Sequence, residues 1–134
     1  MAKNLIPQKR SMDKLLSFAQ KSWALEDWDL AWKFGQSESE AEIDVLFTEK
    51  KATITFDEEY AARLWAEDRK KAWAQFTRDM VHEITHIVLY PITRGLDDWK
   101  EHRIPKSEQA IFDEQLNTRE NEVIDFIITR VFKL

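Results

Sequence analysis

A long helical pattern in the middle of the chain constrains the fold more than any other feature. Residues 57–90 contain no glycine and no proline, and their apolar residues recur at helical spacing. Asp57 is placed to cap the start of this segment, with Glu58 and Glu59 in the first turn, where they favour the helix dipole. Because one helix of this length is long for a globular domain, we predict a bend or break near residues 67–71.

Alternating patterns ahead of this segment predict a small sheet. Apolar and polar residues alternate in 28–34 and again in 43–47, and residues 52–56 are rich in β-branched side chains. Lys50 and Lys51 are expected at the tip of a turn between the last two strands. A helix capped by Ser11 and running to about Leu25 is predicted before the first strand.

Pro91 is expected to end the long helix, because proline lacks the N–H that continues the hydrogen-bond ladder. Residues 92–107 then correspond to a loop or short turns. A final helical region is predicted from Ser107, and its early part, residues 106–119, is expected to form a short helix of its own. The resulting fold class is α+β, with an N-terminal helix, a small and mostly antiparallel three-stranded sheet, the long helix and a C-terminal helix.

The composition favours a single folded domain over residues 1–134, with residues 1–10 flexible. Hydrophobic residues make up 43% of the chain, which is enough to build a core. The chain has no cysteine, so it has no disulfide and no thiolate metal site, in keeping with a cytoplasmic location. We find no secretory signal and no apolar run long enough to span a membrane. The net charge of −5 and the presence of only two glycines argue against a nucleic-acid groove and a nucleotide-binding loop.

The long helical segment carries the sequence His82-Glu83-Ile84-Thr85-His86. Residues four apart on a helix project from one face, so both imidazoles can reach one metal ion. Glu83 lies about 100° round the helix from His82, where its carboxylate can contact a metal-bound water. Without cysteine, the metal would be held by histidine and carboxylate, the ligand set typical of a catalytic zinc. The motif therefore predicts one Zn²⁺, with His82 and His86 as ligands and Glu83 as the catalytic base.

A catalytic zinc usually takes three protein ligands and one water, so one ligand remains to be found. Glu122 in the final helical region is the strongest candidate, and Asp125 is placed to accept the ring N–H of a ligating histidine. Glu120 is a weaker candidate, because it projects about 200° away from Glu122. His102 is the main alternative to Glu122.

The stretch from Trp28 to Arg130 resembles the small zincins of phages and prophages, of the minimal gluzincin type. The resemblance is carried by residues 52–56, by the motif segment 81–91 and by Glu122-Val123-Ile124-Asp125-Phe126-Ile127. It implies a mixed fold in which an edge strand runs beside the metal helix, Glu122 as third ligand, and activity in a host cytoplasm. SprT-like proteases share this layout more distantly but use a third histidine, a role that would fall to His102.

Together, the motif and the resemblance predict a zinc-dependent metallopeptidase that acts on a peptide or protein substrate. Glu83 would take a proton from the attacking water. His102, Tyr90 and Arg94 follow the motif and are candidates for donating a hydrogen bond to the oxyanion. The strand at residues 52–56 is expected to pair with an extended peptide by strand addition. The alternative is a zinc-binding adaptor or assembly protein with the same fold and no peptidase activity.

Overall fold

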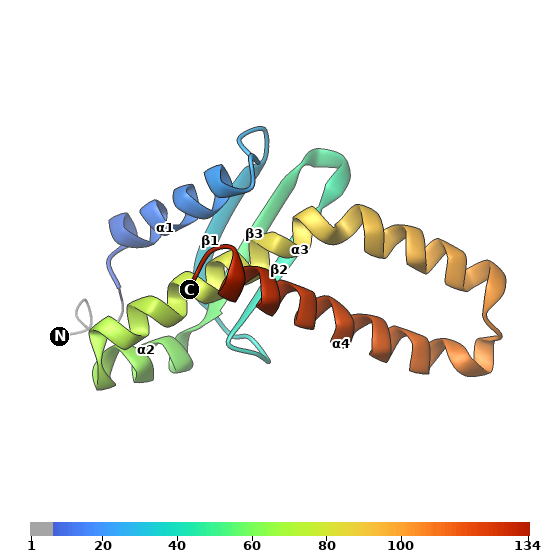
Figure 1. Cartoon of the computed structure of the whole chain (residues 1–134). Coiled ribbons are helices and arrows are strands. Elements are labelled where there is room, and N and C mark those ends of the chain that lie inside the picture. The colour runs from blue at the N-terminus through green and yellow to red at the C-terminus, as the bar shows by residue number, and fades with distance from the viewer. Residues whose placement is uncertain (1–6) are drawn as a thin grey trace. The chain divides into compact units, whose positions relative to one another are not determined.

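The computed structural model describes residues 7–134, which form helices and one small sheet (Figure 1). The elements in chain order are α1 (Lys9–Ser22), β1 (Asp29–Gly35), β2 (Ala41–Leu46), a single 3-10 turn η2 (Phe47–Glu49), β3 (Lys51–Asp57), α2 (Glu58–Glu67), α3 (Arg69–Arg103) and α4 (Lys106–Arg130). The predicted α+β class and its order of helix, sheet and helices are confirmed.

The chain forms two compact units, Met1–Ile84 and Thr85–Leu134, and each is described by itself. The prediction of a single domain over residues 1–134 stays a prediction. The first six residues lie outside the described part of the chain, and so does most of the segment expected to be flexible. Lys9 and Arg10, at the end of that segment, instead belong to the first turn of α1.

The sheet of the first unit has the strand order β1-β3-β2 and is mixed. The β1 and β3 strands are parallel, and Trp32 is opposite Ile54 in their register. The β2 and β3 strands are antiparallel, and Ile43 is opposite Ile54. The expectation of a mostly antiparallel sheet is therefore met for one of the two strand pairs. The parallel pair arises because the segment after β1 crosses to β2 on the far side of the sheet, and β3 then returns between them antiparallel to β2.

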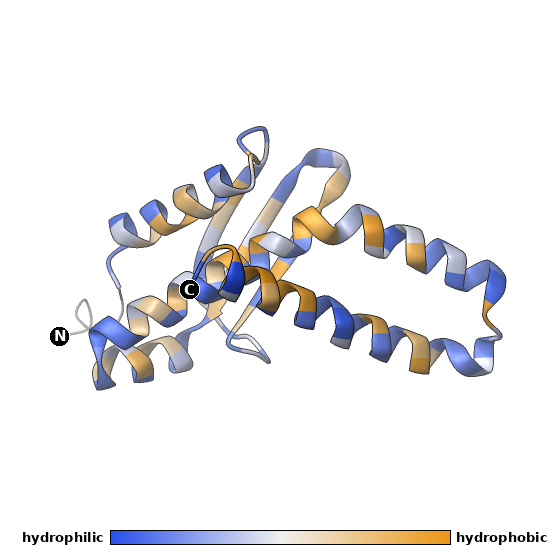
Figure 2. Ribbon diagram, in the orientation of Figure 1, coloured by the Kyte–Doolittle hydropathy of each residue, from blue (hydrophilic) through white to orange (hydrophobic). Residues whose placement is uncertain are grey.

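One face of this sheet is apolar and the other is polar, as the alternating sequence pattern requires. On the apolar face, Ala52, Ile54 and Phe56 of β3 are all buried. The helices cover this face: Trp32 Nε1 donates a hydrogen bond of 2.7 Å to Asp13 of α1, and the ring of Phe56 meets Phe76 of α3 edge-on, with centroids 6.2 Å apart. Figure 2 shows the alternation of hydrophobic and hydrophilic residues along the strands and their helical recurrence along α1.

The long helical segment breaks where the sequence predicts it to break. Asp57 caps α2, because its Oδ2 accepts a hydrogen bond of 3.1 Å from the backbone N–H of Tyr60. The α2 helix ends at Glu67, and Asp68 has an extended conformation with φ −159° and ψ 109°. The carboxylate of Asp68 then accepts the backbone N–H groups of Lys70 and Lys71 at the start of α3.

Pro91 does not end the helix, which corrects the prediction. The α3 helix has 35 residues and contains Pro91 in its interior. Proline removes one helical hydrogen bond, and the hydroxyl of Thr93 donates to the carbonyl oxygens of Leu89 and Tyr90 at 3.3 and 3.1 Å in the same turn. The predicted loop at 92–107 is therefore helical up to Arg103, and the predicted short helix at 106–119 is the first half of α4.

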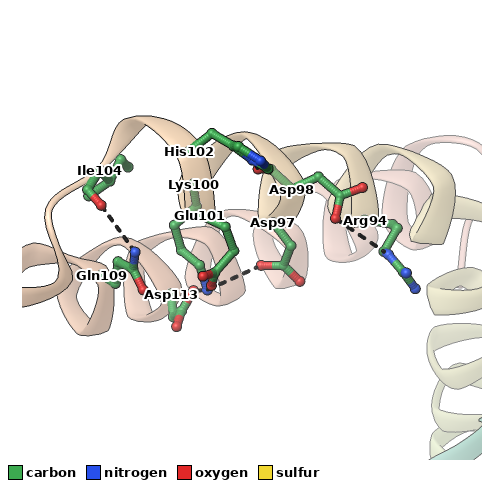
Figure 3. A network of polar contacts seen from close by, with 9 residues as sticks. All are labelled: Arg94, Asp97, Asp98, Lys100, Glu101, His102, Ile104, Gln109 and Asp113. Atoms are coloured by element: carbon green, nitrogen blue, oxygen red, sulfur yellow. Dashed lines mark hydrogen bonds and ion pairs between the residues drawn. The ribbon is translucent and has the colours of Figure 1, made fainter.

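In the second unit, α3 and α4 are joined by the short turn at Ile104 and Pro105, which polar contacts hold in place (Figure 3). Lys100 Nζ lies 2.8 Å from Asp113 Oδ1, and Gln109 Nε2 donates to the carbonyl oxygen of Ile104 at 3.0 Å. Trp99, expected in a loop, is on α3 with its ring against Phe112 of α4 at a centroid distance of 6.3 Å. Over residues 7–134, no helix has both the length and the apolar character needed to cross a bilayer.

The cap at Asp57 gives a first prediction. Its two carboxylate oxygens accept the backbone N–H groups of Tyr60 and of Ser37, at 3.1 and 3.2 Å. Asp57→Ala leaves both donors without this acceptor, so we expect the free energy of unfolding to fall by about 1–2 kcal/mol in urea denaturation. Asp57→Asn keeps one acceptor oxygen and should lose less than half as much. Equal losses in the two variants would contradict the capping role.

The helical position of Pro91 gives a second prediction. Proline in a helix interior is less favourable than alanine by about 3 kcal/mol, so Pro91→Ala should raise the free energy of unfolding by about 1–3 kcal/mol. Pro105 is the matched control, because it precedes the first residue of α4 with φ −57° and ψ 144°, a position that suits proline. Pro105→Ala should give no comparable gain. If Pro91→Ala gave no gain either, α3 would not continue through this residue.

Candidate metal and catalytic site

The predicted motif lies on one uninterrupted helix. His82, Glu83 and His86 all belong to α3, and the boundary between the two units falls after Ile84, inside the motif. The helix buries Met80, Ile84 and Ile87, whereas His82 and His86 are only half-buried. This agrees with the expected division of the helix into an apolar face and a face that presents the histidines.

Glu83 is on the buried side of the helix, three residues after Met80 and seven after Phe76, and it is only 9% exposed. Burial first, and then the negative charges of Asp79 and Glu42, together raise the pKa of the carboxyl to about 8. Glu83 therefore holds a proton at neutral pH as long as no positive charge lies beside it. A cation next to this carboxyl would return it to the ionised form that a general base needs.

Asp79, one helical turn before Glu83, extends this acidic environment within the first unit. Its Oδ1 accepts a hydrogen bond of 2.9 Å from Gln75, and its Oδ2 is buried without a hydrogen-bond partner among the residues described. Burial raises the pKa of Asp79 to about 6, and the charge of Glu40 acts in the same direction. The pKa of the Tyr60 hydroxyl is also raised, first by burial and then by the charges of Asp79 and Glu40. The sequence pattern gave no sign of this cluster, because its members come from α2, α3 and the segment just before β2.

In the second unit the structure brings His86 together with Glu120. The Nδ1 atom of His86 lies 2.8 Å from Oε1 of Glu120, and the two side chains are 24% and 16% exposed. Glu120 lies four and eight residues before Ile124 and Ile128, both buried, so the three share one face of α4. Glu120 was the weaker of the two glutamates by sequence reasoning. The signal that identifies it is its place in this apolar stripe.

Glu122 and Asp125, the predicted third ligand and its supporting carboxylate, are on other faces of α4. Glu122 projects about 200° away from Glu120, and its Oε2 accepts a hydrogen bond of 2.9 Å from Arg119. The Glu122 side chain is 56% exposed, and Asp125 is exposed as well. The structure therefore places Glu120, rather than Glu122, beside a motif histidine, and the ligand role of Glu122 stays a prediction.

The structure separates His102 from the motif. The prediction that His102 is the alternative third ligand is therefore corrected. Both His86 and His102 are on α3 within the second unit, and sixteen residues of helix span about 24 Å. The Nδ1 atom of His102 is instead 2.8 Å from the carbonyl oxygen of Asp98. The same distance argues against His102 as an oxyanion donor at this motif.

The other two oxyanion candidates are closer. Tyr90 follows His86 by one helical turn, and its hydroxyl accepts a hydrogen bond of 2.6 Å from Arg94. Arg94 lies a further turn along the helix and is 3.8 Å from Asp98. Tyr90 is therefore the candidate donor whose position on α3 is nearest to the histidines.

The fit to a zinc ion is partial. Two imidazoles four residues apart on one helix, with a carboxylate on one of them, match a histidine-ligated zinc and the residue that orients its ligand. Within residues 7–134, however, no group of three or more histidine, aspartate or glutamate side chains is arranged to hold a metal ion. The residues on α3 and α4 thus define two ligands and leave the third undefined.

Comparisons with protein-family models, with curated proteins and with solved structures found no match to this chain. The resemblance to phage-type zincins accordingly remains a prediction from the sequence motifs.

The raised pKa of Glu83 gives a third prediction, for the protein in the presence of a chelator. The folded state holds this proton up to a pH of about 8, whereas the unfolded chain loses it near the ordinary value of 4.5. Between these values the folded state binds more protons, so stability falls as the pH rises. Glu83→Gln should remove this fall and gain on the order of 3 kcal/mol over the wild type between pH 4.5 and pH 8.5.

Urea denaturation at a series of pH values measures this effect. The matched control is Glu114→Gln, which changes an exposed carboxyl on α4 and should follow the wild-type profile. Parallel pH profiles for wild type and Glu83→Gln would contradict the burial of an unpaired carboxyl at this position.

Proposed function

We propose that this protein is a zinc-dependent metallopeptidase. The observation that carries the proposal is the arrangement of His82, Glu83 and His86 on one continuous helix, with Glu83 buried and held protonated by its surroundings. An ordinary surface helix has no physical reason to bury a carboxyl among negative neighbours. A carboxyl that works beside a cation does, because the cation supplies the missing charge.

In the proposed site, His82 and His86 would hold the zinc ion, which when bound would acidify a water molecule and polarise a substrate carbonyl. Glu83 would be ionised beside this cation, where it would take a proton from the attacking water and pass it to the departing amine. Burial keeps Glu83 away from bulk water and favours proton transfer to and from the reacting groups. The pair of His86 with Glu120 restricts the ring of that histidine.

The sheet corrects the expected place for a peptide substrate. Residues 52–56 belong to β3, which is the central strand and is paired on both sides, so it has no edge to offer. In the described sheet β2 is an edge strand, and Glu42 of β2 is near enough to act on the charge of Glu83. A peptide adding to the sheet beside α3 would therefore pair with β2. The cytoplasm, and a host cytoplasm for a phage protein, is the proposed place of action.

The fourth prediction tests this function directly. Wild-type protein purified without chelator should contain one zinc per chain and hydrolyse peptides from a mixed library, and a chelator should abolish the hydrolysis. Glu83→Gln should keep the zinc and lower the hydrolysis rate by about 10²–10⁴-fold, since it removes the base and leaves the ligands in place. Glu101→Gln, an exposed carboxyl on the same helix, is the matched control and should keep the wild-type rate.

The outcomes separate the two candidate functions. Zinc binding without hydrolysis of any peptide in the library would favour the alternative, a zinc-binding adaptor or assembly protein. Absence of zinc in the wild type, even after addition of the metal, would overturn both. Full turnover by Glu83→Gln would overturn the role of this residue as the base.

A further inference from the structure

We propose that Glu120 is the positioning residue that fixes the ring of His86 for cation binding, and that Glu120 acts through this contact rather than as a ligand itself. This inference rests on the proposed zinc function. It assigns a role to a side chain in α4 that sequence spacing ranked below Glu122. Both His86 and Glu120 belong to the second unit, Thr85–Leu134.

The contact with Glu120 determines which ring nitrogen of His86 carries the proton. Glu120 Oε1 is 2.8 Å from Nδ1 of His86, a distance that fits a strong hydrogen bond to a carboxylate. A carboxylate can only accept, so Nδ1 carries the proton in the neutral ring. A ring whose Nδ1–H is bound in this way can coordinate a cation only through Nε2, and it does so as the tautomer that needs no further proton loss.

The environment of the pair favours this contact. Both side chains are largely buried, at 24% and 16% exposed, so water competes weakly for this hydrogen bond. Glu120 is part of the face of α4 that also carries Ile124 and Ile128, which are 0% and 1% exposed. A charged residue in that stripe needs a polar partner, and His86 is the partner that the structure provides.

The neighbouring carboxylates on α4 are more exposed to solvent than Glu120. Glu122 is bound to Arg119 at 2.9 Å and is more than half exposed, and Asp125 is exposed. Glu120, in contrast, is 16% exposed and its Oε1 lies 2.8 Å from Nδ1 of His86. We therefore assign the positioning role to Glu120, whereas the sequence pattern placed it at Asp125.

The test measures the tautomer of His86 and the affinity for zinc in the full chain. In metal-free protein at pH 8, nitrogen-15 NMR of the imidazole rings, assigned with His86→Gln and His102→Gln, should show His86 with its proton on Nδ1. Glu120→Ala should shift that ring towards the tautomer with its proton on Nε2. Glu120→Gln keeps an acceptor oxygen and should restore part of the wild-type signal, and Glu114→Gln on the same helix should leave the signal unchanged.

Titration with Zn²⁺ should show a 10–100-fold weaker affinity in Glu120→Ala, the size typical of losing an orienting partner. The visible spectrum of the Co²⁺-substituted protein should keep its band shape in this variant, because the number of ligands does not change. A changed Co²⁺ band shape would make Glu120 a ligand and overturn the positioning role. An unchanged tautomer in Glu120→Ala, or a shift caused by Glu122→Gln instead, would overturn it as well.

The two proposals fail in different ways. If the tautomer responds to Glu120→Ala but wild-type protein binds no zinc, the proposed function is overturned and the contact between Glu120 and His86 is supported. If wild-type protein binds one zinc with an affinity that Glu120→Ala does not change, the proposed function stands and the positioning role is overturned.

Discussion

The burial of the apolar face of α3 against a one-sided sheet is the constraint on which the rest of the first unit depends. The sheet is apolar on one face only, so Ile54 and Phe56 have to be covered from one direction. The ring of Phe76 packs edge-on against Phe56, and Met80 follows one turn later, fully buried. Once these residues fix the rotation of α3 in the first unit, the neighbouring positions of the helix in that unit are fixed as well. That rotation turns Glu83 to the buried side and leaves His82 half-buried.

Because of this rotation, the pKa of Glu83 depends on the surrounding fold and not on the motif itself. Any helix with this motif places the glutamate about 100° from the first histidine, but the motif does not determine what the glutamate meets. Here the glutamate meets an apolar layer and the carboxylates of Asp79 and Glu42, and its pKa rises to about 8. The metal-free state therefore holds Glu83 as a neutral carboxylic acid at neutral pH. If a cation binds as proposed, Glu83 would give up this proton, so the metal affinity would depend on pH through this side chain.

Local patterns predicted much of the fold because they are encoded by neighbouring residues. The three strands, the cap at Asp57 and the break before α3 each depend on a few adjacent side chains. Pro91 misled the prediction because its unfavourable effect is local, whereas the contacts of α3 with α4 beyond it, such as Lys100 with Asp113, favour continuation of the helix. The parallel pairing of β1 with β3 was also beyond local reasoning, since it depends on which strand fills the centre of the sheet.

The candidate site shows the same division between local and tertiary information. His82, Glu83 and His86 are three residues of one helix, so their mutual placement follows from helical geometry alone. The partner of His86 on α4 depends on how the two helices of the second unit meet, and the spacing of the resembling family favoured Glu122. The apolar stripe of α4 favours Glu120 instead, because a helix can bring only one face to its neighbour and Ile124 and Ile128 mark that face. A polar residue on the apolar face of a helix is therefore a better candidate for a buried partner than a residue chosen by its distance along the chain from the motif. His102 shows how sequence spacing can mislead. It follows His86 by sixteen residues, and because these residues are helical the two histidines are about 24 Å apart along α3.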